Sequence, residues 1–377
     1  MKITIPEKVA ELPHEMDSFL IPDFVKKMDE FISRAKQLKK KIPNVLGDYS
    51  HLGIVGIGGS QVQPLVFKAH AAVPTTHLEV PDPYILKTFL ESDKKNTRVI
   101  YCSRSGTTNE VLSFIPYLLD YESLVVTNGG ALLEVANQFG WSIVSVTHDI
   151  SGRFAIQNEL GIVPMIAMGL DPEEFLSNLK KSYKQFFKKG SLAEQTAIKF
   201  WNLEQSGISK AKILPSGHFT EGLGILFTQL LNESVPKTSI DTLDTSLHIM
   251  PRSAHSDLQR WYGGVNDSFL VSILCNNYIN DLAEEDYPKN LRKLVPGIKG
   301  TAGQHLNLTS RAVADTFPGP VFQIELEKDT IAETAQCVGF LQAVTIRLCQ
   351  LKGSNPFDQP AVQHYKDRAS QIYKKMK

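Results

Sequence analysis

Residues 97–120 read TRVIYCSRSGTTNEVLSFIPYLLD, so that a β-rich run, a short polar loop and a helical run follow one another. The first run, TRVIYCS, contains β-branched and aromatic residues and predicts a buried strand. The last run, TTNEVLSFIPYLLD, has apolar residues at helical spacing and predicts a helix. A strand that passes through a tight loop into a helix is the repeating unit of a parallel α/β sheet.

The same alternation extends to both sides of this stretch. The further strands expected in this region are HLGIVGIGG at 51–59, THLEV at 76–80, ESLVVTN at 122–128 and WSIVSVT at 141–147. After a helical stretch at 155–205, a second α/β unit contains the expected strands KAKILPSG at 210–217, DSFLVSILCN at 267–276 and GPVFQIELE at 319–327. We therefore predict an α/β protein with two doubly wound parallel sheets, each flanked by helices.

Composition excludes several function classes. The 40 Lys and Arg residues balance the 40 Asp and Glu residues, which argues against a nucleic-acid-binding protein. No run of 18 apolar residues predicts a membrane span, and the first residues lack the apolar core of a signal peptide, so we expect a cytoplasmic protein. The four cysteines, Cys102, Cys275, Cys337 and Cys349, show no metal-type spacing, and we predict no metal site.

The loop SRSGTT places four hydroxyl side chains around one glycine at the end of a predicted strand. Ligands of parallel sheets bind at the carboxyl ends of the strands, and hydroxyls with free backbone N–H groups bind anions there. Helix caps with solvated neighbours account for this stretch equally well when it is taken alone. The hydroxyl residues are Ser103, Ser105, Thr107 and Thr108.

Six motifs in order resemble the phosphoglucose isomerase family, whose members contain two SIS (sugar isomerase) domains. These motifs are GIGGS, SRSGTTNE, SGRF, NES followed by Lys237, AHSDLQ and NPFDQPAVQHYK. The resemblance implies an N-terminal helical segment at 1–50, SIS domains at 51–180 and 181–353, and a C-terminal loop and helix at 354–377 that closes over the site. It also implies a homodimer with shared active sites, a hexose 6-phosphate substrate and no cofactor.

The activity implied by the resemblance is reversible isomerisation of glucose 6-phosphate to fructose 6-phosphate through a cis-enediol. In this reading Glu233 is the base, Arg153 stabilises the oxyanion, and His255 and Lys366 open the sugar ring. The histidine would act in the site of the neighbouring subunit. The substrate-binding residues that the resemblance implies are Gly59, Ser60, Ser103, Arg104, Ser105, Thr107, Thr108, Gly152 and Gln359.

Simpler roles are open to the same residues. A glutamate at the end of a helix is usually solvated, an arginine usually forms a surface ion pair, and Gly59 with Ser60 suits a tight strand-to-helix turn. The chain also departs from the family pattern at Ser151, where a glycine is usual, and at Val235 and Pro236, which precede Lys237.

Three other functions fit parts of the sequence. The first is a dual phosphoglucose/phosphomannose isomerase with the same base. The second is a non-catalytic SIS sensor of sugar phosphates, which would need only the hydroxyl-rich loop. The third, a dehydrogenase, is disfavoured because GIGGS is not a G-x-G-x-x-G motif.

Overall fold

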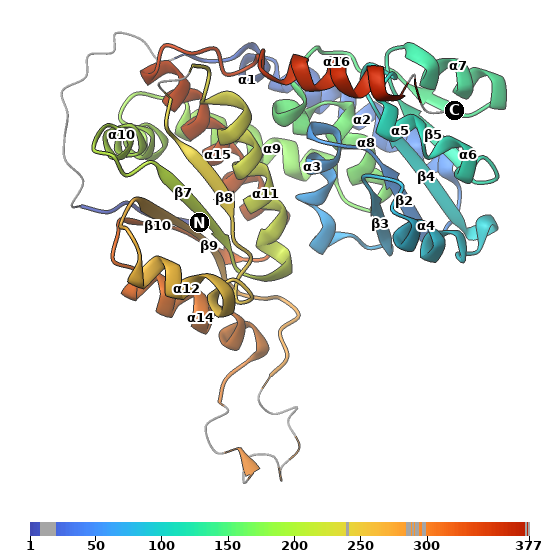
Figure 1. Ribbon diagram of the computed structural model, residues 1–377. Helices are drawn as coiled ribbons and strands as arrows, with labels where there is room; N and C mark the ends of the chain where they lie inside the picture. The colour runs from blue at the N-terminus through green and yellow to red at the C-terminus, as the bar shows by residue number, and fades with distance from the viewer. Residues whose placement is uncertain are drawn as a thin grey trace.

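Two five-stranded sheets, each covered by helices, form the protein (Figure 1). The computed structural model describes residues 1–7, 20–238, 241–283 and 299–373, together with residues 288, 290, 294, 295 and 375. The predicted α/β class with two sheets is confirmed. The predicted limits of the two domains remain a prediction, and the boundary after residue 180 falls inside a helix, α9 (Pro172–Phe186).

The first sheet has the strand order β3-β2-β4-β5-β6, and all its strands are parallel. Its strands are β2 (His51–Val55), β3 (Thr75–Leu78), β4 (Thr97–Cys102), β5 (Glu122–Val126) and β6 (Ser142–Val144). Its main helices are α3 (Gly59–Leu65), α4 (Pro83–Leu90), α5 (Asn109–Leu112), α6 (Ile115–Leu118) and α7 (Gly130–Phe139). Short 3₁₀ helices are η1 (Lys68–His70), η2 (Lys94–Asn96) and η3 (Gly152–Gln157). The loops after β2, β4 and β6 therefore share the carboxyl edge of this sheet.

The prediction of one continuous helix over residues 107–120 is wrong. The segment is split into α5 and α6, which are four residues each. Pro116 explains the break, because proline has no N–H group and its ring collides with the carbonyl group four residues earlier, at Leu112.

The second sheet has the order β1-β10-β9-β7-β8. Its strands are β7 (Lys210–Pro215), β8 (Asp244–Leu247), β9 (Ser268–Asn277), β10 (Val321–Lys328) and β1 (Lys2–Thr4). β7 to β10 are parallel and repeat the connection order of β2 to β5 in the first sheet. β1 pairs antiparallel with β10, which corrects the purely helical N-terminal segment and the purely parallel second sheet that we predicted.

The helices around the second sheet include two that are central to the molecule. They are α11 (Gly217–Ser234), α12 (Ala254–Gly263), α14 (Ala302–Thr316), α15 (Ile331–Leu351) and α16 (Val362–Tyr373). α15 is apolar on nearly all sides and is buried along most of its length, as expected for a helix enclosed by others. It packs against α9, α10 (Leu192–Gln205) and α11.

One hydrophobic core joins the two sheets. It includes Ile54 and Ile100 from the first sheet, Ile213 and Ile273 from the second, and Val344 from α15. The helices α1 (Asp23–Lys26), α2 (Met28–Leu46) and α8 (Glu159–Ala167) contribute to the same core. All four cysteines are buried free thiols. Because the core is continuous, the loops of the first sheet hold a fixed position relative to α11.

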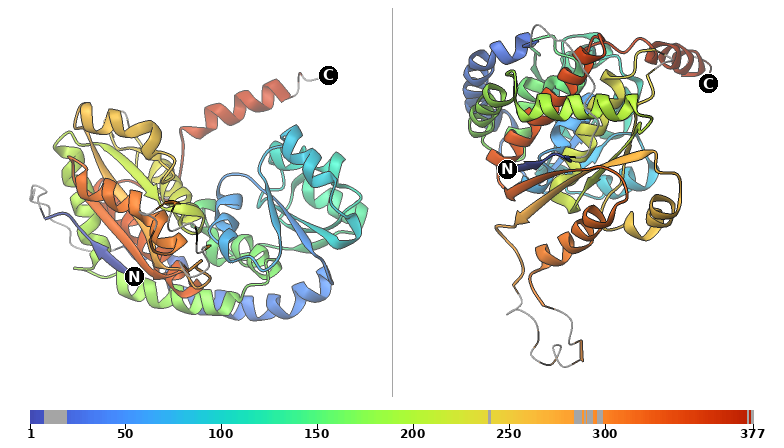
Figure 2. Two further views of the ribbon diagram at one scale, coloured as in Figure 1. Left: turned by 90° about the horizontal axis from the view of Figure 1, so that it is seen from below. Right: turned by 90° about the vertical axis from the view of Figure 1, so that its left-hand side faces the viewer.

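α16 differs from the other helices in its position. In the left-hand view of Figure 2 it stands apart from both sheets and from the helices that cover them. Tyr365, Ile372 and Tyr373 on this helix are about half exposed or more.

Candidate active site

The loops after β2 and β6 meet backbone to backbone at Gly59 and Gly152. A Cβ atom on Gly59 would lie 2.3 Å from the carbonyl carbon of Gly152 and 2.7 Å from the amide nitrogen of Arg153. Only glycine allows this approach, so Gly59 serves as more than a turn residue. Gln63 of α3 also donates a hydrogen bond from Nε2 to the carbonyl oxygen of Gly152 at 2.8 Å. Ser60 is the second residue of α3 and is half-buried beside this contact.

Arg153 is buried and uses all five of its guanidinium N–H groups in hydrogen bonds. A guanidinium has five such donors in a planar fork, so this side chain is held in one orientation. Its acceptors are Ser234 Oγ at 2.7 Å, Glu233 Oε2 at 3.1 Å, Gln359 Oε1 at 2.7 Å, and the carbonyl oxygens of Pro356 and Asp358 at 2.8 Å each. Burial lowers the pKa of Arg153 below its ordinary value, and Glu233 opposes that shift. The surface ion pair considered from the sequence is therefore excluded.

Glu233 lies in the last turn of α11 and presents both carboxylate oxygens to hydrogen-bond donors. Oε2 accepts from Arg153, and Oε1 accepts from Nε2 of Gln229 at 2.9 Å. The side chain is 33% exposed, so it is reachable from solvent without being fully solvated. The predicted candidates Arg153, Glu233 and Gln359 thus lie together, although they come from three distant parts of the chain.

Gln229 is a site residue that the sequence reasoning missed. It precedes Glu233 by four residues, which places the two side chains on the same face of α11. Its Oε1 atom is buried and has no hydrogen-bond partner among the described residues. Its Nε2 atom would lie 3.7 Å from a Cβ atom on Gly58, so the loop after β2 passes beside it. The available signal was a polar residue four positions before a suspected catalytic carboxylate, a spacing that places both on one face of a helix.

Lys237 holds the C-terminal loop against the end of α11. Its Nζ donates to the carbonyl oxygens of Glu233 at 3.0 Å and Asp358 at 2.6 Å, and it forms an ion pair with Asp358 Oδ1 at 3.1 Å. Val235 and Pro236, the departures from the family pattern, lie between the two residues and leave this contact possible. Arg153 and Lys237 therefore bind the segment 356–359 from two sides.

The hydroxyl-rich loop forms a compact, partly self-bonded turn. Ser103 Oγ lies 3.0 Å from Thr108 Oγ1 and accepts a hydrogen bond from the Gly106 amide at 3.2 Å. Thr107 Oγ1 donates to Ser105 Oγ at 3.1 Å. Thr108 occupies the N-cap position of α5, but its side chain makes no capping hydrogen bond. The Thr108 hydroxyl is therefore not oriented by helix capping.

Gly106 has a positive φ of 63°, and a Cβ atom there would lie 1.8 Å from the carbonyl oxygen of Gly129. The loop after β4 is therefore pressed against the loop after β5, a contact that only glycine permits. The Arg104 side chain points away from the hydroxyls, to the Asp149 carboxylate and to the Ile150 carbonyl oxygen at 3.2 Å. Through this contact the hydroxyl-rich loop touches the segment that leads to Gly152 and Arg153.

The structure does not bring His255 and Lys366 into this cluster. His255 is exposed on α12, and Lys366 is exposed on α16. In the described part of the chain no hydrogen bond or ion pair joins either side chain to Glu233 or Arg153. Figure 1 shows α12 beside α14 at the lower left and α16 at the top, so the two residues lie on distant parts of one subunit.

Both ring nitrogens of His248 lie within hydrogen-bond distance of neighbouring side chains. Its Nδ1 lies 2.7 Å from Asp257 Oδ2, and its Nε2 lies 2.8 Å from Ser246 Oγ. The ring packs edge-on against Trp261, and burial lowers its pKa while Asp257 opposes that shift. This pair fastens the first turn of α12, which carries His255, to the second sheet.

The chain is similar to known proteins over most of its length. No protein-family model matches the chain. The chain is 25% identical over 353 residues to a probable glucose-6-phosphate isomerase of Methanococcus maripaludis, covering 85% of this chain and 77% of that protein. Other relatives, 24–25% identical over 82–90% of this chain, are likewise named glucose-6-phosphate isomerase or probable glucose-6-phosphate isomerase. The predicted resemblance is thereby confirmed at the level of the family.

Solved structures show the same fold. A hypothetical protein, TT0462, from Thermus thermophilus superimposes with a TM-score of 0.80 at 20% identity, covering 93% of this chain and 89% of that chain. A glucose-6-phosphate isomerase from Chlamydia trachomatis superimposes with a TM-score of 0.74 at 18% identity, covering 96% of this chain and 76% of that chain. At sequence identities of 18–20%, these two comparisons show a shared fold.

Within the described ranges, no group of three or more His, Cys, Asp or Glu side chains could hold a metal ion. Among the helices of the same ranges, none is both long and apolar enough to cross a membrane.

Proposed function

We propose that this protein interconverts glucose 6-phosphate and fructose 6-phosphate through a cis-enediol. The observation that carries the proposal is the contact between Glu233 and the buried Arg153. A carboxylate base beside a fixed cation suits a reaction in which a carbon-bound proton moves and an oxygen gains negative charge. Relatives at 22–25% identity carry the name glucose-6-phosphate isomerase, which supports the same reaction.

Proton transfer is assigned to Glu233. In the open-chain aldose, the carboxylate removes the proton from C2, and the electron pair forms the C1–C2 double bond. The carbonyl oxygen at C1 then gains negative charge, which Arg153 stabilises. Glu233 then returns its proton to C1, while the proton of the C2 hydroxyl passes to the C1 oxygen, so that C2 becomes the ketose carbonyl group and C1 carries a hydroxyl group. Because the N–H groups of Arg153 already donate to protein acceptors, the guanidinium is fixed in place and acts on the oxyanion through its positive charge, with no reorientation during the reaction.

Substrate positioning is assigned to the hydroxyl-rich loop and to Gln359. Ser103, Ser105, Thr107 and Thr108 offer hydroxyl groups to a phosphate, and the loop leaves backbone N–H groups nearby. Gly59 allows the substrate and Arg153 to share a narrow space. A phosphate held at one end of the sugar would orient C1 and C2 toward Glu233, and this converts binding energy into rate.

Ring opening is assigned to His255 and Lys366. His255 lies far from Glu233 of its own subunit, so we propose that a second copy of the chain supplies the histidine to this site. Lys366 would come from the same chain, with α16 carried by the loop that Arg153 and Lys237 hold. A homodimer with two shared sites follows from this arrangement.

A coupled assay on purified protein tests the proposal. Fructose 6-phosphate is supplied, and glucose 6-phosphate formation is followed with an NADP-linked glucose-6-phosphate dehydrogenase. Turnover supports isomerisation, and a parallel assay that starts from mannose 6-phosphate shows whether the site accepts both configurations at C2. Binding of hexose phosphate without turnover would contradict the proposal and favour a sugar-phosphate sensor.

A further inference from the structure

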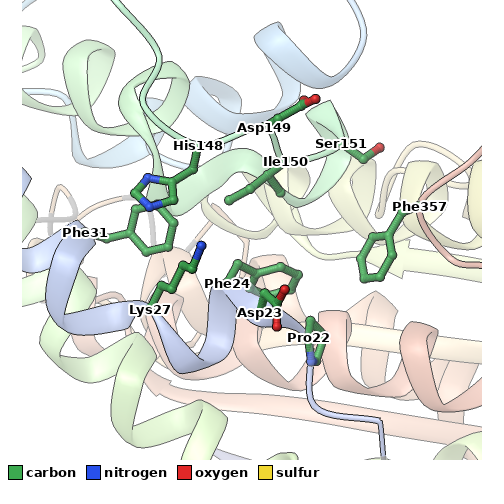
Figure 3. A pocket seen from close by; sticks show the side chains of 10 residues that line it. All are labelled: Pro22, Asp23, Phe24, Lys27, Phe31, His148, Asp149, Ile150, Ser151 and Phe357. Carbon is green, nitrogen blue, oxygen red and sulfur yellow. The ribbon is translucent and has the colours of Figure 1, made fainter.

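A cavity of about 350 Å³ lies behind the segment that leads to Arg153. It opens between α1, the start of α2, the loop after β6 and the C-terminal loop (Figure 3). Its volume falls within the range of small-molecule sites, and its lining mixes aromatic rings with a few polar groups, as such sites do. No residue proposed for substrate binding or catalysis lines it.

The apolar part of the cavity is formed by Phe24, Phe31 and Phe357. Phe357 packs edge-on against Phe24, with ring centroids 6.3 Å apart. Phe31 packs on the His148 ring at 4.6 Å. These rings are fixed by neighbouring core residues, so the apolar wall is preformed and would not need to rearrange around a ligand.

Most charged groups at the cavity are paired, including the lining His148, whose Nε2 lies 3.0 Å from Glu30 Oε2. Of the two carboxylates that line it, Asp23 pairs with Lys26 at 3.2 Å, and Asp149 pairs with Arg104. Lys27 also lines the cavity, and in the described part of the chain its ammonium makes no ion pair. Figure 3 shows this ammonium directed into the space between His148 and the Phe24 ring. Among the described residues, the Lys27 ammonium is therefore a cation of the cavity lining that is in no ion pair, and it lies beside an aromatic wall.

We propose that this cavity is a second ligand site, which binds a small organic anion with an aromatic or apolar body. The anionic group pairs with Lys27, and the body packs on Phe24, Phe31 and Phe357. A charge-assisted hydrogen bond to the ammonium and the removal of apolar surface from water both favour such a ligand. Neither contribution depends on isomerase activity.

The position of Phe357 connects this cavity to the candidate active site. Arg153 Nη2 donates hydrogen bonds to the carbonyl oxygens of Pro356 and Asp358, the residues on either side of Phe357. The Phe357 ring also packs at 5.3 Å on Phe154, which follows Arg153 in the chain. A ligand that packs on Phe357 therefore favours the conformation in which the segment 356–359 is bound to Arg153.

Titration calorimetry with phenylacetate tests the site, because this probe carries one carboxylate and one aromatic ring. Phenylacetamide keeps the ring without the charge, and acetate keeps the charge without the ring. We expect both analogues to bind about tenfold or more weakly than phenylacetate, since each lacks one of the two contributions. Equal binding of phenylacetate and phenylacetamide would overturn the proposal.

Variants at Lys27 locate the binding. Lys27→Met keeps the aliphatic stem but removes the charge, and we expect phenylacetate to bind it about tenfold more weakly. Lys27→Arg should retain most of the affinity. Lys40→Met, later on α2, is the matched control, because Lys40 neither lines the cavity nor pairs with a carboxylate that lines it, and the variant should leave the affinity unchanged. Unchanged binding by Lys27→Met overturns the proposal.

Two additional readouts distinguish binding in this cavity from binding at the substrate site or at a subunit interface. Hydrogen exchange of the amides in 354–361 should slow when phenylacetate binds, and Lys27→Met should abolish that change. Displacement of phenylacetate by fructose 6-phosphate would mean that the probe occupies the substrate site, and would contradict the proposal. A change of sedimentation coefficient in Lys27→Met would also contradict it, because the cavity would then be a contact with a second copy of the chain.

Discussion

Arg153 Nη1 donates a hydrogen bond to Glu233 Oε2 at 3.1 Å, across 80 residues of sequence. The arginine lies in η3, which follows the first sheet, and the glutamate lies in α11, which covers the second. The shared core fixes these elements relative to each other, so the contact is built into the fold. The proposed base and the proposed oxyanion stabiliser therefore form one unit.

The hydroxyl-rich loop should determine the affinity for hexose phosphate. Thr108→Val keeps the shape of the side chain but removes a hydroxyl that caps no helix. If this hydroxyl binds a charged phosphate oxygen, the variant should lose about 1–3 kcal/mol of binding free energy, measured by calorimetry. Thr88→Val on α4 removes a hydroxyl that donates to the Tyr84 carbonyl oxygen and should leave the affinity unchanged. Equal affinities in all three proteins would refute this role of the loop.

The backbone contact of Gly59 should not tolerate a side chain. Gly59→Ala puts a Cβ atom 2.3 Å from the Gly152 carbonyl carbon, so the loops must separate. We expect the free energy of unfolding to fall by about 1–3 kcal/mol, as overpacked sites do, and kcat to fall because Arg153 moves. Urea denaturation and steady-state kinetics measure the two effects. Gly129→Ala is the control, since nothing lies within 4 Å of a Cβ atom there.

His77 should make the stability depend on pH. Burial, aided by Lys68 and His218, lowers the pKa of His77 to about 4, whereas an unfolded histidine titrates near 6.5. As the pH falls from about 6.5 to about 4, the unfolded chain binds a proton that the folded chain does not, so stability is lost in that window. His77→Phe should lose less stability between pH 7 and pH 5 in urea denaturation than the wild type does. His364→Phe on exposed α16 serves as the control, and equal losses in all three proteins would count against this account.

Mixing two inactive variants tests whether the site is shared. Glu233→Gln and His255→Ala should each be nearly inactive alone. In randomly mixed dimers, half of the dimers are hybrids, and each hybrid has one intact site, so about a quarter of the wild-type activity should return. Denaturing and refolding the two variants together, followed by the coupled assay, measures it. No recovery in a mixture shown to contain hybrid dimers would mean that His255 acts within its own subunit or not at all.

Much of the fold was predictable because short stretches of the sequence have apolar patterns typical of strands and helices. The runs that became β2, β4, β5 and β9 are short and apolar and end in glycine or polar loops, which predicts buried parallel strands. The three-residue strand β1 was missed because it contains too few residues to show a pattern. Its partner β10 is more than 300 residues away, so only the tertiary structure reveals the pairing.

The candidate site was predictable only in part. The motifs indicated Arg153, Glu233 and Gln359 through the family resemblance, and the structure brings these side chains together. The roles of Gln229 and Lys237 depend on which side chains lie close together in the folded chain. Spacing along the sequence does not determine those contacts. The donation of Arg153 to the carbonyl groups of Pro356 and Asp358 has no sequence signal, because backbone acceptors are present at every residue.

The substitution Glu233→Gln tests the central claim most directly. Glutamine keeps the size and the hydrogen-bonding reach of the side chain but cannot accept the proton from C2. Hexose phosphate should still bind, while kcat for fructose 6-phosphate falls by about a hundredfold or more. Glu221→Gln on the same helix, whose carboxylate pairs with Lys68 away from the cluster, is the matched control and should keep near-normal kcat. Near-normal turnover by Glu233→Gln in the coupled assay would contradict the account, because another group would then have to move the proton.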